Sequence, residues 1–156
     1  MIRLGLGLAA LVAILDQSSK WLILTQVMSP PRVVEITGFF NLVLVGNRGI
    51  SFGLLSNDSP WAQPVLAVLA FGISIVLLIW LRRAETRFLG AAIGLVLGGA
   101  IGNAVDRLVH GAVVDFLDFH AMGYHWPAFN VADSAICVGV FLILLDGLFA
   151  GKSKTR

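Results

Sequence analysis

Four aspartates in the second half of this apolar chain lie close together in sequence: Asp106, Asp115, Asp118 and Asp133. Two carboxyl groups that converge cannot both ionise easily, so they hold one proton between them. The ionised member of such a pair can take a proton from water while the protonated member polarises a carbonyl group. These residue types therefore permit the hydrolysis of a peptide bond by two aspartates, which needs neither a metal nor a cofactor.

Simpler roles are available for the same residues. Asp106 is followed by Arg107, which could compensate its charge where a helix ends. Asn130 precedes Asp133 by three positions, the spacing of a helix N-cap with an acidic third residue. From spacing alone, both alternatives stay open.

Asp16 and Lys20 lie within the first apolar segment and need a partner, because an ionised side chain in hydrocarbon costs from about 2.5 to more than 10 kcal/mol. Their spacing of four places them on one helix face, which predicts an ion pair. Counted from Arg3, Asp16 is roughly 20 Å along the segment, in its second half. The pair could fix the depth of the helix or support a functional site.

Other kinds of site find little support in the sequence. His110, His120 and His125 have spacings of ten and five, which match no metal-site pattern, and we expect them at a wet interface. The single cysteine, Cys137, permits neither a disulfide nor a cysteine-based zinc site within one chain. The serines have no catalytic-triad context. We therefore predict no metal and no cofactor.

The composition places these residues in a membrane protein. Of 156 residues, 58% are hydrophobic and only 13% charged, and the mean hydropathy is +0.90. The net charge of +2 does not indicate nucleic-acid binding, because the basic residues sit in short clusters beside apolar runs. The length and apolar content predict one integral-membrane domain over residues 1–156.

Four segments are long and apolar enough to cross a hydrocarbon core about 30 Å thick: residues 4–27, 61–81, 88–105 and 132–150. Basic residues flank the start of the first, the link between the second and third, and the end of the fourth. The positive-inside rule then places both termini in the cytoplasm and the aspartates at the outer face. Small residues at every fourth position of the third segment predict that it is the central helix: Gly90, Gly94, Gly98 and Gly102.

The first outer connection, residues 28–60, contains two runs rich in β-branched and aromatic residues, 33–37 and 39–45. Such runs, separated and followed by glycines, predict short strands on the membrane surface. The expected fold class is an all-α membrane protein of four transmembrane helices with a small β-structured extracytoplasmic platform.

Five sequence blocks occur in order along these segments. They are Asp16-Gln17 with Lys20, residues 47–53 (Asn-Arg-Gly-Ile-Ser-Phe-Gly), residues 99–107 from Gly99 through Asn103 to Asp106-Arg107, residues 113–116 (Val-Val-Asp-Phe), and residues 129–134 (Phe-Asn-Val-Ala-Asp-Ser). Together they closely resemble the lipoprotein signal peptidase family, also called signal peptidase II. The resemblance covers nearly the whole chain.

The resemblance implies a role for each matched residue. Asp115 and Asp133 match the two catalytic aspartates, and Asp118 ranks third behind them. The other matches are Asn47 and Arg107 as contacts to the substrate backbone, Asn103 and Asn130 as residues that shape the site, and Asp16, Lys20 and Gly99 as its support. Because Asp133 lies near the positive N-terminal end of the fourth helix, we expect it to be the general base and Asp115 the protonated partner.

The same resemblance implies a bacterial inner-membrane enzyme that cleaves prolipoproteins just before a cysteine carrying a diacylglyceryl group. The expected partners are these substrates and membrane lipids, without nucleic acid, and the enzyme is expected to act as a monomer. A proton-coupled transporter is the main alternative, because intramembrane carboxylates also relay protons. A non-catalytic assembly factor that packs through the glycine-rich helix is a further alternative.

Overall fold

The computed structural model describes residues 1–49 and 61–153, with side chains up to residue 148. Within these ranges lie four long helices and one four-stranded sheet. The helices are α1 (Ile2–Leu22, continued by the π-helical turn Ile23–Val27), α2 (Ala62–Arg82), α3 (Arg87–Val109) and α4 (Val131–Ser153). All four are long and apolar enough to cross a membrane, which confirms the four predicted spans.

Helix α3 runs farther than predicted. It continues past residue 105 to Val109, so Asp106 and Arg107 lie within its last turns. The pair therefore lies close to the helix end, as the simpler alternative supposed, but the ion pair of the fully buried Asp106 is made with Lys20 of α1, as described below.

The central position predicted for α3 is confirmed. It packs against α1, α2 and α4. Within its apolar stretch of 18 residues 67% is buried, against 28% in the corresponding stretches of α1 and α2 and 11% in that of α4. Its glycines permit this close approach, because a Cβ at Gly94 or Gly98 would collide with the backbone of α1. A Cβ at Gly99 would collide with the backbone of Ala132 at the start of α4.

The sheet has the order β1-β2-β3-β4, with all neighbours antiparallel. Strands β1 (Val34–Thr37) and β2 (Phe40–Asn47) coincide with the two predicted runs. Strands β3 (Val113–Ala121) and β4 (Tyr124–His125) come from the second outer connection, where none was predicted. The platform is therefore built from both connections, and β3 joins it to the ends of α3 and α4.

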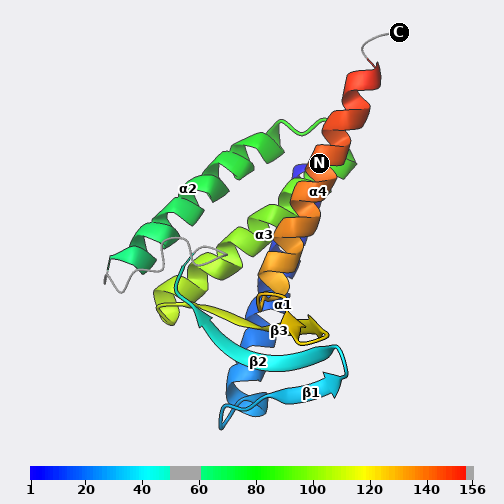
Figure 1. Ribbon diagram of the computed structural model, residues 1–156. Coiled ribbons are helices and arrows are strands. Elements are labelled where there is room, and N and C mark those ends of the chain that lie inside the picture. Colours follow the sequence, from blue (N-terminus) through cyan, green and yellow to red (C-terminus); the bar gives the residue numbers. More distant parts are fainter. Residues whose placement is uncertain (50–60, 154–156) are drawn as a thin grey trace.

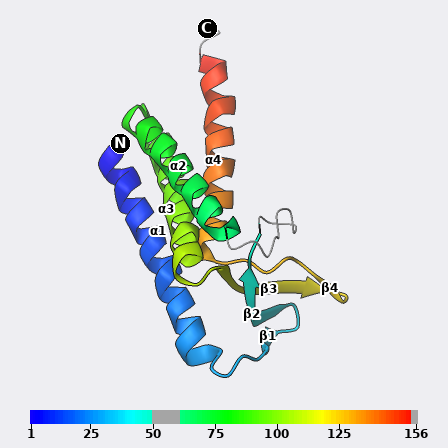
Figure 2. The same ribbon diagram turned by 90° about the vertical axis from the view of Figure 1, so that its left-hand side faces the viewer.

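The sheet lies across one end of the helix bundle, opposite the start of α1 and the end of α4 (Figure 1). At the sheet's end of the bundle α1 and α3 finish and α4 begins. Seen from the side, β3 and β4 extend outward, away from the helices (Figure 2). A cluster of Ile23, Met28 and Phe116 fastens the sheet to the end of α1.

Candidate active site

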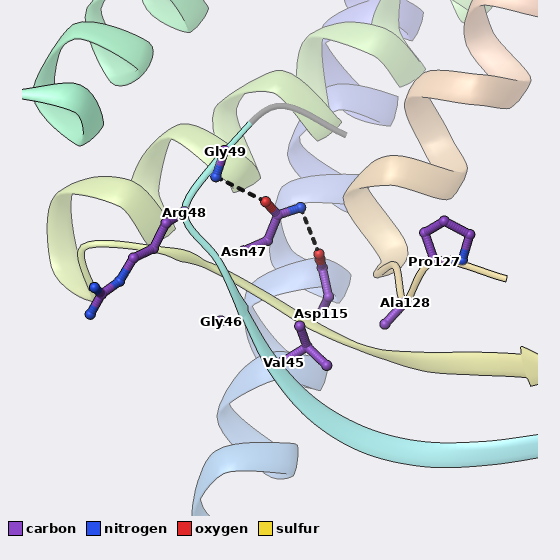
Figure 3. Close-up of a pocket in the computed structure, with 8 residues that line it drawn as sticks. All are labelled: Val45, Gly46, Asn47, Arg48, Gly49, Asp115, Pro127 and Ala128. Atoms are coloured by element: carbon purple, nitrogen blue, oxygen red, sulfur yellow. Dashed lines mark hydrogen bonds between the residues drawn. The ribbon is translucent and has the colours of Figure 1, made fainter. Parts of the chain in front are cut away.

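Asp115 lies on β3 and is only 1% exposed, although it carries a carboxylate. Its Oδ2 accepts a hydrogen bond of 3.0 Å from Asn47 Nδ2, and its Oδ1 accepts one of 2.7 Å from Asn130 Nδ2. Figure 3 shows Asn47 reaching across from the end of β2 to this carboxylate. Burial and the nearby charge of Asp133 raise the pKa of Asp115 to about 6, although the two asparagine donors act in the opposite direction.

Asp133 lies in the first turn of α4. Its Oδ1 accepts a hydrogen bond of 2.8 Å from Asn103 Nδ2 on α3. Its backbone N–H donates to Asn130 Oδ1 at 2.9 Å, so Asn130 caps α4 as the spacing suggested. Asn130 therefore caps α4 and also contacts Asp115, so capping does not exclude the role at the site that was predicted for it.

A chain of amides connects the two aspartates. Asn130 Nδ2 donates to Asp115 and also lies 3.2 Å from Asn103 Oδ1. Because Asn103 Oδ1 accepts from Asn130 and from Lys20 Nζ, the amide nitrogen of Asn103 must face Asp133. The structure thus brings together the residues predicted as the catalytic pair and the two asparagines predicted to shape the site.

Next to this pair lies a second polar group, three charged residues and one amide, which we call the inner cluster: Asp16, Gln17, Lys20 and Asp106. Lys20 Nζ is 2.7 Å from Asp16 Oδ2 and 2.7 Å from Asp106 Oδ2, and all three charged residues are at most 2% exposed. Gln17 Nε2 donates to both carboxylates. The ion pair predicted between Asp16 and Lys20 is confirmed, and it extends to Asp106.

The inner cluster is bonded to the backbone next to each candidate catalytic aspartate. Asp16 Oδ1 accepts from the backbone N–H of Ala132 at 2.9 Å, directly before Asp133. Asp106 Oδ2 accepts from the backbone N–H of Val114 at 3.0 Å, directly before Asp115. Sequence reasoning assigned no such function to Asp106 or Gln17. The sequence feature that could have pointed to these two residues is a charge or an amide near the end of an apolar helix.

Arg107 and Gly99, two further predicted site residues, also lie at this end of α3. Arg107 Nη1 donates to the carbonyl of Asn103 at 3.1 Å. Its Nε is buried and has no hydrogen-bond partner among the residues that the structure describes. Gly99 contacts the backbone of Ala132 and so allows α4 to reach Asn103.

Asp118 lies apart from this pair. The residue is 5% exposed, and its carboxylate accepts from Asn41 Nδ2 at 3.1 Å and lies 2.9 Å from His125 Nδ1. In residues 1–49 and 61–148, no group of three or more His, Cys, Asp or Glu side chains is placed to hold a metal ion. Asp118 therefore belongs to a separate cluster on the sheet.

A cavity of about 440 Å³ opens beside Asp115, and we call it the dyad pocket. Its lining comes from the end of β2, from Asp115 and from the segment before α4: Val45, Gly46, Asn47, Arg48, Gly49, Asp115, Pro127 and Ala128 (Figure 3). Asn47 Oδ1 accepts from the backbone N–H of Gly49 at 3.1 Å, which fixes its amide toward Asp115. The rest of this sequence block, residues 50–53, lies outside the described residues.

Comparison with known proteins gives a consistent result. The family described as "Signal peptidase (SPase) II" matches residues 8–149. The lipoprotein signal peptidase of Azoarcus sp. (strain BH72) is 51% identical over 154 residues, which cover 96% of this chain and 85% of that protein. The lipoprotein signal peptidase of Aeromonas hydrophila is 48% identical over 151 residues, which cover 96% and 90%.

Solved structures agree with these relatives. A bacterial membrane enzyme determined by the in meso method at 2.3 Å matches with a TM-score of 0.85 and 32% identity, over 100% of this chain and 93% of that one. A second, at 1.9 Å, matches with a TM-score of 0.80 and 33% identity, over 95% and 94%. The peptidase prediction is confirmed over the transporter and the assembly factor. The chain belongs to the signal peptidase II family.

Proposed function

We propose that this chain removes the signal peptides of prolipoproteins by cleaving the bond before a diacylglyceryl-modified cysteine, with Asp115 and Asp133 as its catalytic residues. Residues 1–156 act as a single integral-membrane peptidase domain. The observation that carries the catalytic assignment is the amide chain through Asn130 and Asn103, which holds two carboxylates from separate elements at one site.

The two aspartates have different roles. Burial and the charge of Asp133 raise the pKa of Asp115 to about 6, so we assign the proton of the pair to Asp115 and the role of general base to Asp133 in the first turn of α4. Asp133 takes a proton from water as the water oxygen bonds to the scissile carbonyl carbon, while Asp115 gives its proton to the carbonyl oxygen. The resulting tetrahedral diol collapses when the C–N bond breaks, the nitrogen takes a proton from Asp133, and the diol returns one to Asp115.

Neighbouring donors orient this reaction. Asn47 and Asn130 hold the carboxylate of Asp115, and Asn103 holds that of Asp133. The buried Nε–H of Arg107 has no hydrogen-bond partner among the described residues, so a substrate carbonyl that reaches it on binding would satisfy this donor, which supports a role in binding the peptide backbone. Lys20, Asp16 and Gly99 support the site without touching the substrate.

The membrane position would select the substrate. A cysteine with two acyl chains is confined to one leaflet, so its scissile bond is presented at a fixed depth. The candidate site lies where α3 ends and α4 begins, beside a sheet that extends outward from the bundle. We place this end at the outer face of the bacterial inner membrane, with both termini cytoplasmic, because basic residues flank the opposite helix ends.

The decisive experiment incubates the purified, monomeric full-length chain with a diacylglyceryl-modified prolipoprotein. Asp115→Asn and Asp133→Asn should each lower the cleavage rate by about a thousandfold or more, because each removes a proton-transfer group. Glu35→Gln is the matched control, since Glu35 is exposed on β1 outside the site, and it should retain wild-type activity. Wild-type rates in either aspartate variant would overturn the assignment.

A further inference from the structure

A second cavity of about 420 Å³ lies beside the dyad pocket on the sheet, and we call it the distal pocket. Both pockets are lined by Val45, Pro127 and Ala128, so they form one continuous groove. The distal pocket adds residues from β2, β3 and β4 and from the segments that adjoin β1 and β4: Val33, Asn41, Val43, Asp118, His125 and Trp126. The groove therefore leads from Asp115 to Asp118.

A β-bulge allows both aspartates to line this groove. Side chains three positions apart on a regular strand point to opposite faces. In β3, however, the backbone N–H groups of Phe116 and Leu117 both donate to the carbonyl of Phe129, at 3.1 and 2.9 Å. Phe116 and Leu117 thus both lie opposite the single residue Phe129, which is the pattern of a β-bulge, and both side chains pack against the apolar cluster of Ile23 and Met28. Asp115 and Asp118 consequently share the other face.

The distal pocket presents hydrogen-bond acceptors. Asp118 is 5% exposed and Asn41 is 7% exposed, and the amide of Asn41 donates to the Asp118 carboxylate. Asn41 Oδ1 is buried without a partner in the described part of the chain. Burial acts to raise the pKa of Asp118, but hydrogen bonds from His125 and Asn41 outweigh it and lower the pKa. The Asp118 carboxylate keeps its partners Asn41 and His125, whereas the amide oxygen of Asn41 beside it has none, so the pocket offers an acceptor next to a negative charge and favours a cationic donor.

We propose that the distal pocket is a subsite for a lysine or arginine side chain of the substrate, two to four residues after the scissile bond. Three residues along a strand span roughly 10 Å, the length that an extended peptide of about three residues also covers. The sheet extends away from the helices, so it meets the part of the substrate that leaves the lipid after the modified cysteine (Figure 2). This subsite deepens the proposed function and rests on it.

The test uses three diacylglyceryl-modified prolipoproteins that differ only in the second to fourth residues after the scissile bond, which are all lysine, all serine or all glutamate. The wild-type chain should cleave the lysine substrate with a kcat/KM about tenfold above that of the glutamate substrate, with serine between them. Asp118→Asn should reduce the ratio to about twofold or less. Glu85→Gln removes an exposed acidic charge between α2 and α3, at the opposite end of the bundle, and should keep the full ratio.

Each outcome decides between the alternatives. Equal wild-type rates for the three substrates would overturn the subsite, and this comparison needs no variant that has to fold. An undiminished lysine preference in Asp118→Asn would also overturn it. If wild type cleaves none of the substrates, the proposed peptidase function itself fails, which is a different result from cleavage without preference.

Discussion

The inner cluster and the distal pocket are two buried polar groups on either side of Asp115, and they differ in whether their acceptors are satisfied. In the inner cluster all four carboxylate oxygens of Asp16 and Asp106 have donors. In the distal pocket, Asn41 Oδ1 has none among the described residues. A buried network in which every acceptor already has a donor stabilises the fold and leaves no acceptor for a ligand. An unsaturated one beside a cavity is suited to binding.

Removing the cation of the inner cluster should have the largest effect. Lys20→Met leaves two buried carboxylates without their shared partner, which should destabilise the protein by about 3–5 kcal/mol. Asp118→Asn, which keeps a polar side chain of the same size beside Asn41 and His125, should cost about 1 kcal/mol or less. Denaturation in detergent measures both. Equal losses of stability in the two variants would mean that the two clusters do not differ as proposed.

Crowding the inner cluster should have the next largest effect. A Cβ at Gly102 would lie 2.5 Å from Asp16 Oδ2, so Gly102→Ala must displace this carboxylate and should cost about 1–3 kcal/mol. Gly72→Ala on α2 is the control, because no described atom outside its own helix lies within 4 Å of the added Cβ. It should be neutral or stabilise by up to about 1 kcal/mol. If Gly102→Ala leaves the free energy of unfolding unchanged, the close contact between Gly102 and the Asp16 carboxylate is contradicted.

Asp115 and Asp118 should affect the pH dependence of stability in opposite directions. The folded protein raises the pKa of Asp115 to about 6, so stability falls as pH rises from about 4 to 6. It lowers the pKa of Asp118, so that contribution is present above about pH 4 and is lost at lower pH. Relative to wild type, the melting temperature of Asp115→Asn should fall less, by a few degrees, between pH 4 and 7.

Asp118→Asn should instead flatten the rise in melting temperature between about pH 3 and 5. Measuring both variants at the same pH values in one detergent separates the two contributions. If both variants change the same pH range in the same direction, the two aspartates do not have opposite environments.

The smallest expected effect concerns Asn47. Because Asp115 must be protonated in the proposed mechanism, kcat/KM should fall as pH rises through its pKa, near 6 in the free enzyme. The Asn47 hydrogen bond favours the ionised carboxylate, so Asn47→Ala should raise this pKa and move the falling limb to higher pH by about one unit or less. A falling limb that stays in place while the rising limb moves to higher pH would reverse the assigned roles.

Much of the architecture was predictable because hydrophobic length determines a membrane span. The four helices, the central α3 and the first two strands follow from apolar length, glycine spacing and β-branched runs. Lys20 and Asp16 were predictable as a pair because a spacing of four places them on one helix face.

Other features depend on contacts between segments, which spacing does not reveal. Asp106 pairs with Lys20 across two helices instead of with its neighbour Arg107. Strand β3 was not predicted, because its apolar residues are interrupted by Asp115 and Asp118. The bulge that turns these two aspartates to one face depends on Phe129, which is distant in sequence. The roles proposed for Asn47, Asn103, Asn130 and Arg107 remain predictions until their variants are measured.

Asn130 has a further consequence for biosynthesis. Its amide oxygen caps α4 by accepting from the backbone N–H of Asp133, and its amide nitrogen donates to the carboxylate of Asp115 on β3. A newly inserted chain whose fourth span has not yet docked lacks this amide at Asp115. Under the proposed chemistry, such a chain would be inactive, so incompletely folded molecules would not cleave other polypeptides in the membrane.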